Sequence, residues 1–299
     1  MEVQGVEFIE AQELYNVLNR GFKYPSVSDP LYLLLIDCRQ ESEYIDNHIL
    51  TAKKAVYNEE GKFDVPYSCD IECTGLIVVY DQGSKQLKDG RNSPYTCASR
   101  LWAMGSRNPV KVLKGGYEKF SALYPFLRSE KIMFTPRELD NIKTYPIEIL
   151  PSLLYLGNWS HGTSAYIQKE LKINRHIICS KRKGTFFKMP GKFFYNVSVN
   201  DDEDADIYRK FHGACTFICD HRIRRNVVLV FSDLGISRSA TIAIAFVMQF
   251  KQLTLKDAYD HVKSCCPEIR PNRNFIDQLS DWEEELYDVK TTDISDPNY

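Results

Sequence analysis

The stretch 227–240 constrains the fold most, because an apolar run is followed there by a loop rich in glycine and serine and then by an alanine-rich segment. The run 227–231 predicts a strand that is buried on both faces, as in a parallel sheet covered by helices. The segment 241–250 predicts a buried helix. The sequence therefore predicts an α/β fold in which the loop joins a central strand to a helix.

This loop has the composition of an anion-binding site. Its residues are Ser232, Asp233, Leu234, Gly235, Ile236, Ser237 and Arg238. The first N–H groups of the following helix have no partners within the helix and lie at the positive end of its dipole, so they attract anions. Arg238 can add a bidentate contact to a phosphate group. The loop predicts a phosphate site, but it contains no cysteine that could act as a nucleophile.

Length and charge narrow the class of protein. A chain of 299 residues is typical of two domains that each bury a core. With 38 basic and 40 acidic side chains, nothing global indicates binding to nucleic acid or to a membrane. The acidic start argues against a secretory signal, and the longest apolar stretch is about half of the ~18 residues that a spanning helix needs. We expect a soluble protein without nucleic acid or membrane as a partner.

The nine cysteines are odd in number and are not spaced as a disulfide framework. Cys69 with Cys73, or Cys215 with Cys219, would suit half of a zinc site, but neither pair is accompanied by a second pair of cysteine or histidine residues. We expect free thiols, no metal and no other cofactor. Such thiols are typical of a cytoplasmic protein, with the nucleus as an additional location.

The first part of the chain alternates predicted strands and helices, which indicates a parallel sheet with helices. The strands are expected at 31–37, 76–80 and 110–113, and the helices at 10–18, 41–44 and 95–104. Several motifs in this part resemble the rhodanese-like domain. They are residues 35–39, 43–44, 48–49, Ala52, 113–117 and Phe120.

The resemblance implies a rhodanese-like domain at 1–130 that has lost its reactive residue. Active members carry the sulfur-transfer cysteine directly after the strand that corresponds to 76–80, and this chain has Asp81 there. Cys97, the next cysteine along the chain, falls within a predicted helix, with Leu101 and Trp102 as core partners. We therefore expect no sulfurtransferase activity.

A linker is predicted at 131–145, a second α/β domain at 146–288 and a frayed polar tail at 289–299. The strands of this domain are expected at 153–157, 176–180, 193–199 and 227–231, and the helices at 165–171, 206–221, 241–250, 254–264 and 274–286. Its motifs resemble the dual-specificity phosphatase domain. They are residues 149–151, 154–158, 235–240, 271–275 and 278–279. A rhodanese-like domain in front of such a domain resembles the arrangement of the MAP-kinase phosphatases.

In active members of that family the loop opens with histidine and cysteine, and the cysteine attacks phosphorus as a thiolate. Here Phe231 and Ser232 stand at these positions. A serine hydroxyl needs an adjacent general base to act as a nucleophile, and Phe231 cannot accept a proton. The resemblance therefore implies a pseudophosphatase. It would bind phosphorylated proteins, or active phosphatases and kinases, and would compete with them or act as a scaffold.

Three other positions of this domain leave alternatives open. Asp201 lies where the resemblance puts the general acid, with Asp206 at a matching offset, yet 200–206 also fits a solvated acidic loop. Ser239 is either a helper of the nucleophile or a helix N-cap. Asp233 would do little harm if it pointed to solvent, but it would repel phosphate if it pointed inward.

Two rival functions and two basic patches remain. The chain could be a weak phosphatase that uses Ser232 or water with Asp201, or a structural module with a vestigial loop.

The run 181–183 could meet an acidic partner or be merely solvated. Lys53 and Lys54 lie near the place of the arginine-rich kinase-docking run in the family, but two lysines are fewer than that run contains. This argues against docking of a MAP kinase.

Overall fold

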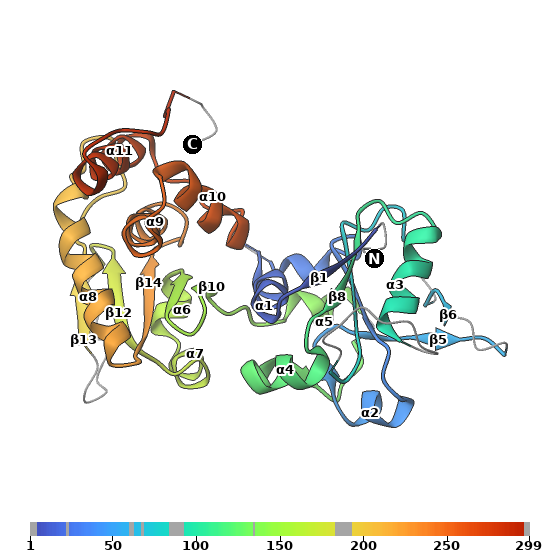
Figure 1. Ribbon diagram of the computed structural model, residues 1–299. Helices are drawn as coiled ribbons and strands as arrows, with labels where there is room; N and C mark the ends of the chain where they lie inside the picture. The colour runs from blue at the N-terminus through green and yellow to red at the C-terminus, as the bar shows by residue number, and fades with distance from the viewer. Residues whose placement is uncertain are drawn as a thin grey trace. The chain divides into compact units, whose positions relative to one another are not determined.

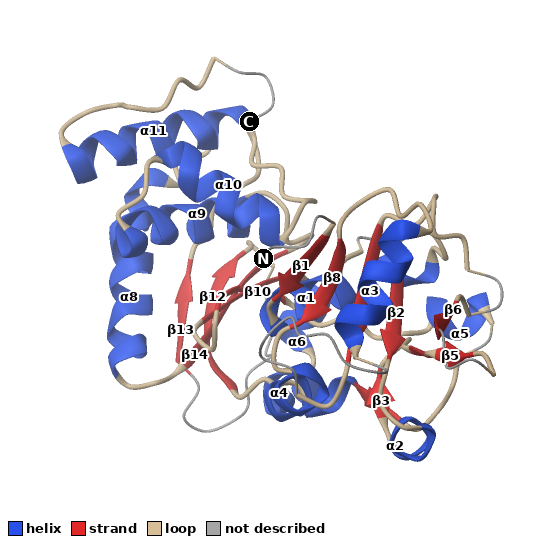
Figure 2. Cartoon of the chain, turned by 45° about the vertical axis from the view of Figure 1, so that its right-hand side comes forward, coloured by secondary structure: helices blue, strands red, loops and turns tan. Residues whose placement is uncertain are grey.

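The computed structural model describes residues 5–21, 24–59, 63–66, 69–83, 93–133, 135–182 and 193–295. The chain forms two compact units, Met1–Thr144 and Tyr145–Tyr299. Each unit contains its own five-stranded sheet with helices packed against it, as Figures 1 and 2 show. The predicted α/β fold with two sheets is confirmed. In the part of the chain that the structure describes, no helix combines the length and the apolar character needed to cross a membrane.

The sheet of the first unit is parallel throughout. Its strands, in spatial order, are β1 (Val6–Ile9), β8 (Val110–Leu113), β7 (Leu76–Tyr80), β2 (Leu33–Asp37) and β4 (Lys53–Lys54). The helices are α1 (Ala11–Asn19), α2 (Glu41–Asp46), α3 (Pro94–Ala103), α4 (Gly116–Leu123) and α5 (Pro136–Asp140). Two short ribbons pair β3 (His48–Ile49) with β9 (Arg128–Ser129) and β5 (Val56–Tyr57) with β6 (Phe63–Asp64). Single 3₁₀ turns occur at Ser26–Ser28 and Pro125–Leu127.

The sheet of the second unit is parallel except for one edge strand. Its strands, in spatial order, are β10 (Ile147–Leu150), β11 (Leu154–Gly157), β14 (Val227–Ser232), β12 (Ile173–Cys179) and β13 (Phe193–Asn196). The helices are α6 (Trp159–Thr163), α7 (Ala165–Glu170), α8 (Phe211–Ile223), α9 (Arg238–Lys251), α10 (Leu255–Cys265) and α11 (Arg273–Tyr287), with a 3₁₀ turn at Tyr208–Lys210. Figure 1 shows β14 leading up into α9.

The central strand β14 is buried on both faces, as its apolar sequence predicts. Because side chains alternate along a strand, Val228 and Val230 join the core that α8 to α11 form on one face. Phe231 points to the other face, where its ring packs against Trp159 at the start of α6. The end of β14 is thus fixed from both sides, which positions the loop that follows.

The structure differs from the predictions in several short elements. The strand β1 and the helices α4 and α6 were not predicted, because segments this short carry little periodicity. The expected helix at 206–221 is wrong at its start, since a 3₁₀ turn precedes α8. The predicted linker contains α5, which a capping box between Thr135 and Glu138 stabilises.

The expectation of a frayed tail is wrong for the residues described up to 295. The buried Glu283 of α11 accepts hydrogen bonds from the backbone N–H groups of Thr291 and Thr292 and from the Thr292 hydroxyl. Ile294 packs against the core of the second unit. The residues 296–299 lie outside the described part of the chain.

Candidate functional site

The loop between β14 and α9 has one tightly constrained turn. Gly235 has a φ of +84°, a left-handed conformation that favours glycine. A Cβ there would lie 2.8 Å from the carbonyl oxygen of Gly157 at the end of β11. The backbone N–H of Arg270 donates to the carbonyl oxygen of Ile236 at 2.7 Å. The loop is therefore held by β11 on one side and by the segment before α11 on the other.

Ser232 occupies the floor of this loop and is buried. Its hydroxyl accepts a hydrogen bond from the N–H of Gly235 at 3.1 Å and lies 2.9 Å from the hydroxyl of Ser239. Among the described residues, no imidazole or carboxylate forms a hydrogen bond with Ser232. Ser239 lies inside α9, whose N-cap is Ser237, so the interpretation of Ser239 as an N-cap is wrong.

Phe231 precedes Ser232 and is fully buried in an aromatic environment. Its ring centroid lies 5.8 Å from that of Trp159 and 6.2 Å from that of His176. A Cβ on Gly162 in α6 would approach the Phe231 ring to 2.4 Å, so the ring fills the space that this glycine leaves. Position 231 thus contributes apolar packing beneath the loop.

Arg238 lies between two carboxylates at the opening of α9. Its Nη2 is 2.7 Å from Asp233 Oδ2, its Nε is 3.5 Å from Asp201 Oδ2, and its Nη1 donates to the carbonyl oxygen of Val199 at 3.3 Å. Only 11% of the Arg238 side chain is exposed. Acceptors from the chain itself therefore bind the two terminal nitrogens of this guanidinium, while its Nε has no hydrogen-bond partner among the described residues.

Asp233 points inward, which decides the alternative that the sequence left open. Besides its contact with Arg238, its Oδ1 lies 2.6 Å from Nε of Arg182, and the Ser180 hydroxyl donates to it at 3.1 to 3.2 Å. The guanidinium of Arg182 also lies over the ring of Trp159, 5.3 Å from its centroid. Sequence reasoning noted Arg182 only as part of a basic run and did not consider Ser180, whose signal is its place directly after β12. Lys183 of that run lies outside the described residues.

Asp201 is brought to the rim of the loop, about as the resemblance implied. Its Oδ1 accepts hydrogen bonds from the Ser237 hydroxyl at 2.6 Å and from Nδ2 of Asn272 at 2.9 Å. Asp201 is nevertheless exposed, so both interpretations of 200–206 stay predictions: a solvated acidic loop, and a loop that supplies a carboxylate to the rim. Asp206 instead forms an exposed ion pair with Arg209. Asn272, the N-cap of α11, belongs to a motif noted in the sequence but was not expected to hold Asp201.

Cys179 lies beside Ser232, because the two residues are opposite each other in the register of the neighbouring strands β12 and β14. It is fully buried, and this burial raises the pKa of its thiol, although the charge of Arg238 opposes the shift. A thiol that stays protonated is a poor nucleophile. Cys179 therefore does not replace the cysteine that position 232 lacks.

The corresponding loop of the first unit begins at Asp81, directly after β7. Asp81 Oδ1 accepts a hydrogen bond from the N–H of Gly83 at 3.1 Å, and its carbonyl oxygen accepts one from Tyr117 at 2.8 Å. Cys97 lies in α3 and is buried, and desolvation raises the pKa of its thiol well above the usual value. A cluster that sequence reasoning missed lies nearby, where Arg39 pairs with the buried Asp37 at 2.7 Å and stacks on the Tyr117 ring.

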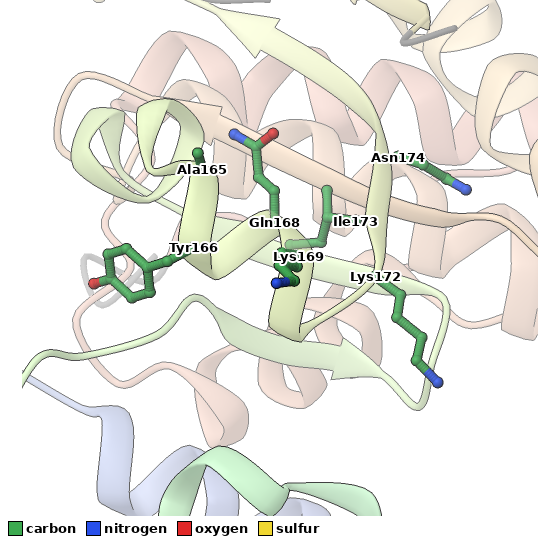
Figure 3. Close-up of a pocket in the computed structure, with 7 residues that line it drawn as sticks. All are labelled: Ala165, Tyr166, Gln168, Lys169, Lys172, Ile173 and Asn174. Carbon is green, nitrogen blue, oxygen red and sulfur yellow. The ribbon is translucent and has the colours of Figure 1, made fainter. Parts of the chain in front are cut away.

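A pocket of about 570 Å³ lies away from the loop, along α7 and the start of β12 (Figure 3). Tyr166, Lys169 and Lys172 are among the residues that line it. None of the residues proposed for the phosphate site takes part. In the described ranges, no group of three or more histidine, cysteine or acidic residues could hold a metal ion.

Each of the two units contains a region that matches a known protein family. Residues 26–123 match the rhodanese-like domain, and residues 154–285 match the catalytic domain of dual specificity phosphatases. The chain carries a rhodanese-like domain followed by a dual-specificity phosphatase domain. The two resemblances found in the sequence are thus confirmed at the level of the domains.

Curated relatives of this two-domain chain include two human phosphatases. Human dual specificity protein phosphatase 16 is 30% identical over 274 residues, a match that covers 85% of this chain and 41% of the relative. Human dual specificity protein phosphatase 5 is 31% identical over 234 residues, covering 70% of this chain and 60% of the relative. The chain therefore spans only about two to three fifths of the length of these relatives.

Among solved structures, the phosphatase domain is similar to human tyrosine phosphatase-like serine/threonine/tyrosine-interacting protein. That match has 28% identity, covers 49% of this chain and all of the other, and has a TM-score of 0.44. A mouse putative dual specificity phosphatase, solved with zinc tungstate, matches at 23% identity over 52% of this chain and 94% of the other, with a TM-score of 0.47.

Proposed function

We propose that the chain is a catalytically inactive phosphatase homologue, a pseudophosphatase of the MAP-kinase-phosphatase type that regulates phosphorylation signalling by binding. The observation that carries the proposal is the environment of Ser232. Its hydroxyl contacts Ser239 and the N–H of Gly235, while the buried ring of Phe231 precedes it. Within the described part of the chain, a hydroxyl in this place has a donor and a second hydroxyl as neighbours, but no general base.

The chemistry of the reacting atom supports the same conclusion. A cluster of N–H groups and positive charges can lower the pKa of a cysteine from about 8.5 to about 3.5, which produces the attacking thiolate. A serine hydroxyl ionises at much higher pH, so the same surroundings leave it protonated at neutral pH. It needs a base within hydrogen-bond reach to be activated.

The partners proposed for such a protein are phosphorylated proteins, active phosphatases or kinases, in the cytoplasm and also in the nucleus. The protein would compete with these partners or hold them together. We do not propose docking of a MAP kinase. Lys53 and Lys54 form the two-residue strand β4 at the edge of its sheet, and the Nζ of Lys54 bonds to the carbonyl oxygen of Ala55.

The position of Asp201 favours a second candidate, a weak dual-specificity phosphatase that uses Ser232 or water. Its carboxylate lies at the rim of the loop and close to Arg238. A general acid has to donate a proton to the leaving oxygen. We prefer the inactive alternative because, among the described residues, no base forms a hydrogen bond with Ser232.

Turnover of an aryl phosphate ester by the purified full chain separates the two candidates. The wild type and Asp201→Ala are compared at equal concentration, with a well-folded state confirmed by circular dichroism. We expect no turnover above the buffer rate in either protein. Turnover that persists through successive purification steps and is lost in Asp201→Ala would overturn the proposal.

A further inference from the structure

Asp233 forms an internal ion cluster at the mouth of the loop. Its carboxylate contacts Arg238 at 2.7 Å and Arg182 at 2.6 Å, and it accepts hydrogen bonds from Ser180. The backbone N–H of Arg182 in turn donates to the Ser180 hydroxyl at 3.1 Å. The segment after β12 and the start of α9, which are distant in sequence, thus both donate to the Asp233 carboxylate.

This arrangement leaves Arg238 poorly suited to an external phosphate. A bidentate contact with phosphate uses two neighbouring N–H groups of a guanidinium. Nη2 bonds to Asp233 and Nη1 donates to the carbonyl oxygen of Val199, whereas Nε lies 3.5 Å from Asp201 and forms no hydrogen bond within the described part of the chain. An entering phosphate would have to displace Asp233, or else lie beside a carboxylate of the same charge.

We propose, on the basis of the pseudophosphatase function above, that Asp233 is an intramolecular anion that holds Arg238 and excludes tetrahedral oxyanions from the loop. The excluded ligands are phosphate, its tungstate analogue and phosphorylated side chains. Loss of the nucleophile at Ser232 removes turnover, and Asp233 separately removes phosphate binding. A phosphorylated partner would then be bound by surfaces outside this loop.

Exclusion by a single carboxylate makes a specific prediction for its neutral variants. Asp233→Asn keeps the size of the side chain and removes its charge, so Arg238 becomes available. We expect affinity for tungstate to rise at least about tenfold, because a like charge next to the site and the main competitor for Arg238 are both removed.

Isothermal titration calorimetry with sodium tungstate, and then with a phosphotyrosine peptide, tests the proposal on the full chain. The proteins are the wild type, Asp233→Asn, Asp233→Gln as a second neutral variant, and Asp233→Asn combined with Arg238→Ala. Asp260→Asn is the matched control, since Asp260 forms an exposed ion pair with Lys256 in α10. Thermal unfolding confirms that each variant is folded.

The expected result is tighter tungstate binding by both neutral Asp233 variants, unchanged binding by Asp260→Asn, and loss of the gain when Arg238 is also replaced. The proposal would be overturned if the wild type and both neutral variants bound tungstate with equal affinity. It would also be overturned if none of them bound tungstate. Turnover of an aryl phosphate ester is measured in the same samples. Turnover by the wild type would contradict the proposed function instead, so the two failures are distinguishable.

Discussion

Phe231 and Gly162 show how a single position can change the chemistry of a loop and still fit the fold. The ring of Phe231 occupies the space above the glycine, with Trp159 and His176 at its edges. Packing of this kind stabilises the end of β14 through buried apolar contacts. Phe231, whose ring offers no proton acceptor, is therefore a member of the apolar layer beneath the loop.

Replacing Gly162 by alanine should destabilise the second unit. The added Cβ would lie 2.4 Å from the Phe231 ring, and overpacking of this kind costs about 1–3 kcal/mol. Urea unfolding followed by tryptophan fluorescence measures the loss. In a Phe231→Ala background the clash is absent, so the same substitution should then cost much less. Equal costs in both backgrounds would show that the ring is not the cause.

The sequence predicted which residues form the loop, but it did not predict where their side chains point. The sequence alone places Phe231 and Ser232 at the start of the loop, and the proposed loss of the nucleophile rests on these two residues. The inward direction of Asp233 does not follow from the sequence, because its partners Ser180 and Arg182 come from the segment that follows another strand, β12. They reach Asp233 only through the pairing of Cys179 with Ser232 between β12 and β14.

The elements of the second unit are linked by a buried carboxylate on α11. Glu283 Oε1 accepts hydrogen bonds from the N–H of Leu255 at 2.7 Å and from the hydroxyl of Thr292, while Oε2 accepts from the N–H groups of Thr291 and Thr292. Glu283 thereby accepts a hydrogen bond from a backbone N–H in the first turn of α10, which has no partner within that helix. It also holds the segment that follows α11 in place.

Replacing Glu283 by alanine should release that segment and weaken the fold. It leaves the buried N–H of Leu255 without its acceptor, and loss of hydrogen bonds to a buried charged group costs about 2–4 kcal/mol in total. Urea unfolding measures the stability, and the rate of tryptic cleavage after Lys290 reports on the released segment. Glu284→Ala is the control, because Glu284 is exposed and contacts only Lys290 at 3.5 Å among its ion pairs. Similar effects of both substitutions would contradict the account.

Elements with an apolar run or a clear helical period were predictable, and those without such a pattern were not. The strands β7 and β8 and the helices α9 to α11 follow from apolar runs and periodicity in the sequence. The positions of Thr291 and Thr292 are instead fixed by hydrogen bonds to Glu283 on the preceding helix. No local sequence pattern predicts these bonds.

At the scale of the whole molecule, each of the two units lacks a cysteine at the position where its family carries the reacting one. Asp81 follows β7 in the first unit and Ser232 ends β14 in the second. Cys97 and Cys179 are buried, and this burial raises the pKa of both thiols and disfavours their thiolate forms. The order of the two domains was predictable from their motifs, because each motif is short and local in the sequence.

The central claim is that turnover is lost at the reacting residues, while the surrounding phosphatase domain remains complete. The most direct test is turnover of an aryl phosphate ester by the full chain carrying Phe231→His and Ser232→Cys, with and without Asp233→Asn. The account predicts no turnover in the double variant, in which Asp233 still holds Arg238, measurable turnover in the triple variant, and none when Arg238→Ala is added to the triple variant. A folded triple variant that binds tungstate but shows no turnover would contradict it, because the loss would then extend beyond these residues.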